Sequence, residues 1–139
     1  MLSGGYQHSL DTKGRVFFPT RLKEQMGEAL ILCRGVEKCL MVFSPSGWAQ
    51  FESGIRTLPF SRARDMQRFF FSTAAECSVD RQGRLLIPQN LRDYAGLSAN
   101  AMITGVQTRA EIWDVAEWDK YNESLLPADI IAQMDDIGF

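Results

Sequence analysis

The sequence predicts an α+β fold, rich in β-strands, in which two pseudo-symmetric copies of one unit form a single body with peripheral helices. The motif Asp-x-x-Gly-Arg, followed by an apolar triplet and a proline, occurs at residues 11–19 and again at residues 80–88. The chain has 139 residues, of which 45% are hydrophobic. Half of that length rarely builds a sufficient core alone, so we expect the two copies to share one core.

Each copy opens with a strand and a tight turn. Tyr6 to Leu10 and Glu76 to Val79 alternate in polarity, which is typical of a strand. The turns that follow begin at Asp11 and Asp80 and have glycine at their fourth position. This pattern favours a type I turn, because the aspartate side chain can accept hydrogen bonds from nearby backbone amides.

An apolar triplet and a short helix follow each turn. Residues 16–18 and 85–87 predict buried strands that stop at a proline, which cannot donate to a β-ladder. The apolar spacing of Thr20 to Met26 and of Gln89 to Ala95 predicts one or two helical turns. A glycine follows each helix, where a left-handed cap would end it. These glycines are Gly27 and Gly96.

A strand pair and a longer helix complete each copy. The predicted pairs are Ala29 to Cys33 with Cys39 to Phe43, and Ala101 to Val106 with Arg109 to Trp113. Ser44 and Asp114 are predicted N-caps of the helices that follow. We expect these helices to place Trp48 and Trp118 on their inner faces.

A connector joins the copies, and an acidic segment follows the second. We predict a connecting helix from Ser61 to Ser72, which carries three arginines. We expect the segment from Ala128 to Phe139 to be weakly helical and mobile. We divide the chain into a first repeat (5–47), a helical connector (48–75), a second repeat (76–119) and an acidic tail (120–139).

The composition limits the possible classes of protein. No apolar stretch approaches the roughly twenty residues that a membrane span needs, and the first residues lack a basic and apolar leader. Cys33, Cys39 and Cys77 are odd in number and lie inside apolar runs, which argues against a disulfide framework and a zinc site. We expect a soluble protein of a reducing cytoplasm, without metal, cofactor or small-molecule substrate.

The net charge of −2 conceals an asymmetry. Residues 1–69 hold ten Lys and Arg against six Asp and Glu, whereas residues 70–139 hold five against eleven. The halves therefore carry +4 and −6. Binding to nucleic acid would need a local basic face rather than bulk attraction.

Catalysis has little support in the sequence. His8 is the single histidine, and its place in an alternating strand favours a packing role over a Cys-His pair. The chain lacks a zinc-binding helix motif, a phosphate loop ending in lysine, and a serine elbow.

The arginine of the repeated motif is the strongest functional signal. Asp11 with Arg15, and Asp80 with Arg84, could form purely structural ion pairs, yet a turn does not require arginine. A guanidinium group matches a phosphate or the O6/N7 edge of guanine, and a neighbouring carboxylate can hold it in one orientation. Further cations surround both turns. They are Lys13, Arg21 and Lys23 in the first copy and Arg81 and Arg92 in the second.

The whole chain resembles the MraZ family of bacterial transcriptional regulators, which contain two tandem SpoVT-AbrB-type swapped-hairpin domains. The matching residues of the first copy are Gly4, Tyr6, His8, Asp11, Lys13, Gly14, Arg15 and Pro19. Those of the second copy are Glu76, Cys77, Asp80, Gln82, Gly83, Arg84, Leu86, Ile87, Pro88, Leu91, Arg92, Ala95, Gly96, Leu97, Glu111, Ile112 and Trp113.

The resemblance implies a fold and a function. The expected fold is two AbrB-like repeats interlocked in a double-ψ-barrel-like body. The expected function is sequence-specific binding of a ring-like homo-oligomer to double-stranded DNA, at short direct repeats in the promoter of the division and cell-wall genes. Repression is the expected outcome, and the nucleoid the expected location.

The resemblance also assigns DNA contact to the Asp-x-x-x-Arg positions. Together with the neighbouring cations, the candidate DNA-binding residues are Asp11, Lys13, Arg15, Arg21, Asp80, Arg81, Arg84 and Arg92. The family's cation before glycine is Lys13 in the first copy, but Gln82 takes that place in the second and the charge moves to Arg81. The two copies therefore need not contact DNA equally.

Binding strength independently favours an oligomer. Two bidentate arginine–base contacts give about 2 to 6 kcal/mol of discrimination, and specific regulators usually reach about 4 to 10 kcal/mol. Several protomers on several DNA repeats would supply the difference through avidity.

Two other classes of binding protein fit the same residues. One is a ring-forming interaction module whose arginines bind an acidic protein. The other is an AbrB-like antitoxin, although the chain lacks a long unstructured toxin-binding tail. An enzyme that uses His8 ranks third.

Overall fold

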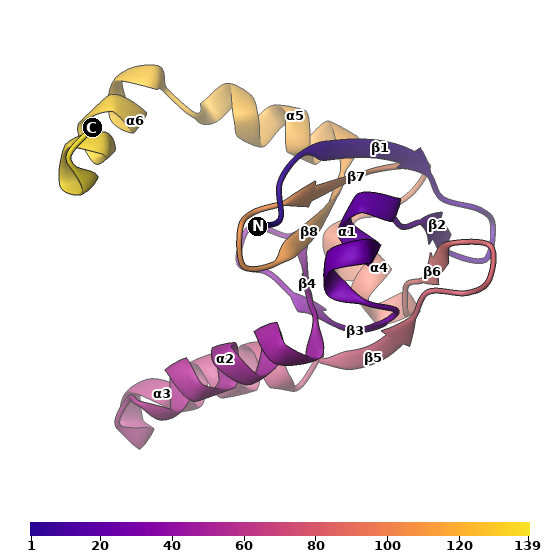
Figure 1. The fold of residues 1–139 in the computed structure, drawn as a ribbon, viewed down its shortest axis with the longest axis horizontal. Coiled ribbons are helices and arrows are strands. Elements are labelled where there is room, and N and C mark those ends of the chain that lie inside the picture. The colour runs from indigo at the N-terminus through magenta and orange to yellow at the C-terminus, as the bar shows by residue number, and fades with distance from the viewer.

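The first strand of each copy pairs with the hairpin of the other copy. The computed structural model describes residues 1–139. In it, β1 (Gly5–Ser9) pairs with β7 (Asn100–Gly105), and β5 (Ala75–Ser78) pairs with β3 (Ala29–Arg34). The six-stranded antiparallel sheet has the order β1-β7-β8-β4-β3-β5, which maps onto itself in reverse when the copies are exchanged (Figure 1). This confirms the predicted β-rich fold of two interlocked, pseudo-symmetric repeats.

The two hairpins meet at the centre of the sheet. β3 pairs with β4 (Leu40–Phe43), β7 pairs with β8 (Ala110–Asp114), and β4 pairs with β8. All four residues of β4 are buried, as expected for a strand at the centre of a sheet that is covered on both faces.

A separate two-stranded ribbon is formed by β2 (Arg15–Phe17) and β6 (Arg84–Leu86). Val16 and Leu85 are opposite each other and face the core, with exposed fractions of 1% and 0%. The prediction of continuously buried strands is wrong at the residues beside them, Phe17 and Leu86, which point outward. The ribbon has the core on one side only, so alternate residues must face solvent.

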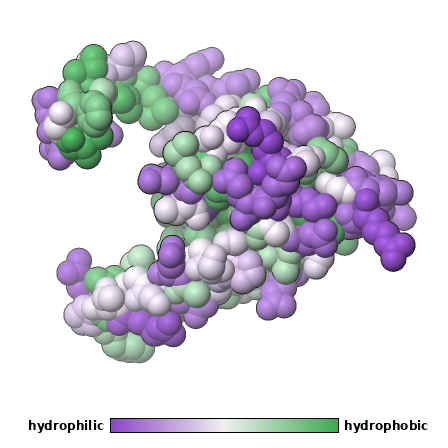
Figure 2. All heavy atoms as spheres, viewed as in Figure 1, coloured by the Kyte–Doolittle hydropathy of each residue, from purple (hydrophilic) through white to green (hydrophobic).

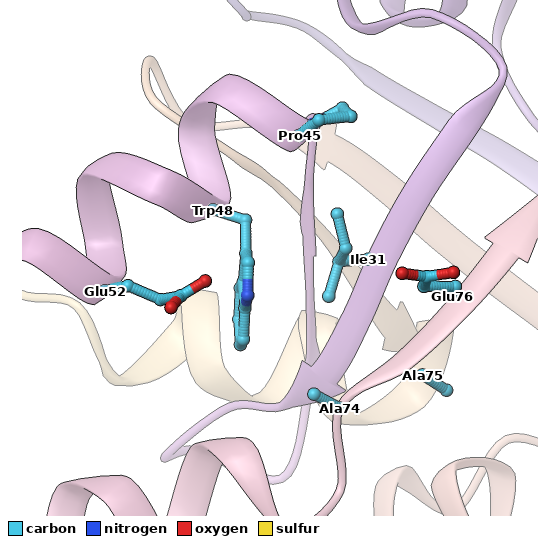
Figure 3. A pocket seen from close by; sticks show the side chains of 7 residues that line it. All are labelled: Ile31, Pro45, Trp48, Glu52, Ala74, Ala75 and Glu76. Carbon is cyan, nitrogen blue, oxygen red and sulfur yellow. The ribbon is translucent and has the colours of Figure 1, made fainter.

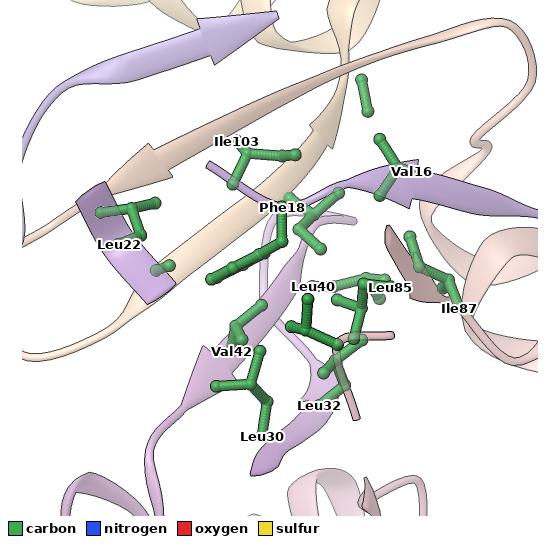
Figure 4. Close-up of a cluster of buried hydrophobic side chains, with 14 of the residues drawn as sticks. Val16, Phe18, Leu22, Leu30, Leu32, Leu40, Val42, Leu85, Ile87 and Ile103 are labelled. Atoms are coloured by element: carbon green, nitrogen blue, oxygen red, sulfur yellow. The ribbon is translucent and has the colours of Figure 1, made fainter. Parts of the chain in front are cut away.

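The helices α1 (Thr20–Met26) and α4 (Gln89–Ala95) have the predicted bounds. They join the ribbon and the sheet in a core of seventeen buried residues, most of which are drawn in Figure 4. Gly96 has the predicted left-handed conformation (φ 63°, ψ 30°). The same prediction is wrong at Gly27 (φ 88°, ψ −173°), where ψ is extended and β3 begins two residues later, at Ala29.

The connector forms a helical arm. Ser44 caps α2 (Pro45–Arg56) as predicted, since its Oγ accepts a hydrogen bond from the Gly47 amide at 3.1 Å. The helix α3 (Phe60–Met66) continues into a π-helical turn (Gln67–Phe71). A second cluster of six buried residues holds this arm against β3 and β4. It consists of Cys33, Met41, Phe43, Ile55, Ala63 and Phe70.

The second arm is formed by the C-terminal segment. Asp114 caps α5 (Val115–Ser124), and the Trp118 ring packs edge-on against Trp113 with centroids 5.5 Å apart. α6 (Pro127–Met134) and a 3₁₀ turn (Asp135–Ile137) then extend away from the body, and none of their residues is buried. Both arms project from the same side of the body (Figure 1).

The limits of the four predicted segments and the mobility of the tail stay predictions.

None of the helices is both long enough and apolar enough to cross a lipid bilayer.

Candidate nucleic-acid interface

The first turn is organised by the carboxylate of Asp11. Its Oδ1 accepts hydrogen bonds from the amides of Lys13 and Arg15, both at 2.9 Å, and its Oδ2 accepts one from Arg15 Nε at 2.6 Å. The Gly14 amide donates to the Asp11 carbonyl at 3.1 Å and closes the turn. The hydrogen bonds to the carboxylate lower the pKa of Asp11 from 3.8 to about 2, and the bond from the Arg15 amide makes the largest contribution.

The second turn repeats this arrangement. Asp80 Oδ1 accepts hydrogen bonds from the amides of Gln82 and Arg84 at 2.9 Å, and Oδ2 accepts one from Arg84 Nε at 3.1 Å. The pKa of Asp80 is lowered as well, chiefly by the hydrogen bond from the Arg84 amide. The predicted structural ion pairs are therefore both present.

Each ion pair uses only one nitrogen of its arginine. Arg15 and Arg84 donate through Nε, and their terminal Nη1 and Nη2 groups donate to no other residue. The two side chains are 29% and 31% exposed. The aspartates thus orient the guanidinium groups while the two terminal nitrogens keep their donors available for a ligand.

The ribbon places both arginines on one face. Arg15 lies opposite Leu86, and Phe17 lies opposite Arg84. Because side chains alternate along a strand, these four residues share the outer face. The ladder extends into the turns, since the Gly14 carbonyl accepts from the Ile87 amide at 3.0 Å and the Gly83 carbonyl from Phe18 at 2.8 Å. The major groove of B-DNA admits a two-stranded ribbon of this kind.

The remaining predicted cations differ in how exposed they are and in the contacts they make. Lys13, Arg21 and Arg81 are exposed and form no ion pair. Arg92 is half-buried, and its guanidinium occupies the place where a side chain on Gly14 would begin. Its Nη2 donates to Gln89 Oε1 at 2.8 Å, and its Nε is buried without a partner. Arg92 of the second copy therefore supports the turn of the first copy.

Sequence reasoning missed the two apolar members of the outer face, Phe17 and Leu86. The sequence signal that could have found them is their spacing, because each lies two residues after an arginine and therefore on the same face of a strand as that arginine. The continuous apolar triplets concealed it, because a strand buried on both faces has the same composition.

In the structure, His8 forms no hydrogen-bonded pair with any of the three cysteines. The His8 ring packs edge-on against Phe17 with centroids 5.0 Å apart, and its side chain makes no hydrogen bond. Burial raises the pKa of the Cys33 and Cys39 thiols to about 12. Burial also raises the pKa of the Cys77 thiol above its usual value. Thiols of this kind are poor nucleophiles.

A cleft of about 420 Å³ lies where α2 meets β3 and β5. Figure 3 shows the Trp48 ring beside Ile31, with the carboxylates of Glu52 and Glu76 at the edges of the cleft. Its charged groups are both acidic, so this surface does not suit a polyanion.

The fold and the site define a class of protein, the tandem swapped-hairpin proteins, in which two repeats of one chain interlock and display paired Asp–Arg turns. A family model described as "MraZ protein, putative antitoxin-like" matches residues 1–68 and again residues 70–136. The chain belongs to the MraZ family.

Curated relatives match along nearly their whole length. A protein of Heliobacterium modesticaldum is 47% identical over 92% of this chain and 91% of its own. One of Acetivibrio thermocellus is 47% identical over 96% and 95%, and one of Desulforamulus reducens is 48% identical over 88% and 87%. All three are named "Transcriptional regulator MraZ".

Proposed function

We propose that this protein is a sequence-specific DNA-binding regulator of transcription, and that the outer face of the β2/β6 ribbon enters the major groove. The observation that carries the proposal is the pair of arginines on this face, each fixed through Nε by an aspartate and each with two free terminal nitrogens. Such a fork can make bidentate hydrogen bonds to O6 and N7 of guanine. Lys13, Arg21 and Arg81 contact the flanking phosphates.

The target consists of short direct repeats in the promoter of division and cell-wall genes, and binding represses transcription. The names of the relatives support a role in transcription. The family resemblance supports the promoter and the repeats, since several identical sites would suit several identical protomers.

The working form is a ring of protomers. The two arms support this form, because their charges are opposite: the connector arm (45–71) holds four Arg against two acidic residues, and the C-terminal arm (115–139) holds one Lys against six. Contact between the connector arm of one protomer and the C-terminal arm of the next would be head-to-tail, and such contacts form a ring when the rotation between neighbouring protomers closes.

The surface of α6 supports the same contact. Figure 2 shows hydrophobic residues gathered over this helix. Leu126, Ile130 and Ile131 are 57%, 41% and 64% exposed. A helix with this much exposed apolar surface is typical of a protein interface.

The experiment that tests the proposal is selection of bound sequences from random DNA by the full chain, followed by affinity measurements across salt concentrations. We expect an enriched motif present in repeats, and affinity that falls steeply with salt because each phosphate contact releases counterions. A selection without any enriched motif, together with salt-insensitive binding, would overturn the proposal.

A further inference from the structure

The outer face of the ribbon carries two apolar side chains between its two guanidinium groups. Leu86 is 53% exposed and Phe17 is 37% exposed, whereas Val16 and Leu85 on the inner face are 1% and 0% exposed. A single exposed apolar residue is ordinary in a folded protein. What distinguishes these two is that each lies directly across the ladder from a candidate DNA-binding arginine.

The hydrogen-bond pattern brings each apolar residue close to its arginine. The Ile87 amide donates to the Gly14 carbonyl, so the neighbouring pair of Arg15 and Leu86 is a non-hydrogen-bonded pair of the ladder. Side chains in such pairs approach more closely than in hydrogen-bonded pairs. The same reasoning, from the bond between the Phe18 amide and the Gly83 carbonyl, applies to Phe17 and Arg84.

The Phe17 ring is held in place. It lies over Gly83, where an added Cβ would come within 2.7 Å of its Cε2 atom, and it packs edge-on against His8. Leu86 makes no comparable ring contact and is more than half exposed. The face thus offers one fixed and one adaptable apolar contact, each beside a guanidinium.

The major groove has one apolar feature, the C5-methyl group of thymine, and apolar side chains recognise it by contact. We propose that Leu86 and Phe17 contact thymine methyl groups. In each cross-strand pair, the arginine would then read a guanine and the apolar residue would read a thymine near that guanine. This inference rests on the proposed function and adds the base that the apolar residues select.

The test uses the full chain and the DNA motif selected by it. Each thymine of the motif is replaced singly by deoxyuridine, which lacks only the methyl group, and the dissociation constant is measured for wild-type protein and for Leu86→Ala. We expect wild-type affinity to fall about fourfold at the contacted thymine, the factor expected for one buried methyl-sized group. Leu86→Ala should bind the thymine and deoxyuridine probes equally at that position.

Control variants separate this inference from the proposed function. Val36→Ala removes an aliphatic side chain that is 68% exposed but lies off the ribbon, and should keep the full response to deoxyuridine. Phe17→Ala is measured with the same probes. If Phe17→Ala disturbs the Gly83 turn, Phe17→Leu replaces it, because leucine keeps an apolar side chain at this position. Two results would overturn this inference but not the proposed function. One is specific binding that is not weakened by deoxyuridine at any position. The other is a Leu86→Ala variant that distinguishes thymine from deoxyuridine as strongly as the wild type does. Absence of specific binding would overturn the proposed function with it.

Discussion

Arg15 and Leu86 belong to different copies of the duplicated motif, yet they occupy opposite positions of one β-ladder. The backbone around them is shared in the same way, because the Gly14 carbonyl of the first turn accepts a hydrogen bond from Ile87 of the second copy. The candidate interface is therefore composite. Neither copy can form this surface alone, which ties recognition of a ligand to the interlocking of the fold.

Substitution of Gly14 should destabilise the protein. Gly14 has φ 84°, which strains any residue with a Cβ, and the added atom would also overlap the Arg92 guanidinium. We expect Gly14→Ala to lower the free energy of unfolding by about 1 to 2 kcal/mol. Thermal or denaturant unfolding measures the change.

Gly54→Ala is the matched control for this prediction. Gly54 lies in α2 with nothing within 4 Å of an added Cβ. Alanine is the better helix former, so this variant should gain about 0.5 to 1 kcal/mol. Equal effects of the two substitutions would contradict the strain assigned to the first turn.

The Asp11 carboxylate should stay ionised across the physiological range. Its pKa is about 2 in the folded protein and near 3.9 in an unfolded chain. The lower folded value means that the carboxylate stabilises the fold above about pH 4, and that this contribution is lost as the pH falls from about 4 to about 2. NMR titration of the side-chain carboxyl carbon measures the pKa directly. A midpoint near 4 would show that the hydrogen bonds from Arg15 and Lys13 do not form.

The buried thiols should resist modification. Burial raises the pKa of Cys33 and Cys39 to about 12, so almost no thiolate is present at pH 8. We expect an aromatic disulfide reagent to leave both thiols unlabelled in the native protein and to label all three cysteines in denaturant. Rapid native labelling of Cys33, located by peptide mass spectrometry, would contradict the packing of the second cluster, and rapid labelling of Cys39 would contradict its complete burial.

The apolar face of α6 should be needed for assembly but not for the fold of the protomer. Ile131 is 64% exposed, so Ile131→Asp should leave the circular dichroism spectrum unchanged while it lowers the mass of the particle in solution. Light scattering after size exclusion measures that mass. Ser124→Asp, a change of the same charge in α5, is the control. A particle whose mass is unchanged by Ile131→Asp would remove α6 from the interface.

Much of the fold could be predicted from the sequence because the duplicated motif contains residues that begin and end the turns, strands and helices. Asp11 and Gly14 define a turn, Pro19 ends a strand, and Gly96 ends a helix in the predicted left-handed conformation. The pairing of β2 with β6 was not accessible from residue patterns, since contacts between distant segments leave no local periodicity. The error at Phe17 and Leu86 has a different cause, since a continuous apolar triplet has the same composition whether one face of the strand or both faces are buried.

The candidate site was predictable in its parts and less so in its assembly. The Asp–Arg pairs follow from spacing within one turn, and the structure confirms both ion pairs. The position of Arg92 depends on the packing of one copy against the other, and it lies against the Gly14 turn rather than free in solvent. Contact of the eight predicted residues with DNA stays a prediction.

The proposed reading of DNA by Arg15 and Arg84 together is tested by the affinity of Arg15→Ala and Arg84→Ala for the selected motif relative to random DNA. Lys38→Ala, which removes one positive charge from the exposed turn between β3 and β4, outside the ribbon and both arms, is the control. We expect each ribbon variant to lose about 1 to 3 kcal/mol of discrimination per binding site while it keeps its fold and particle mass. Full discrimination in both ribbon variants, or equal loss in Lys38→Ala, would contradict this role of the two arginines.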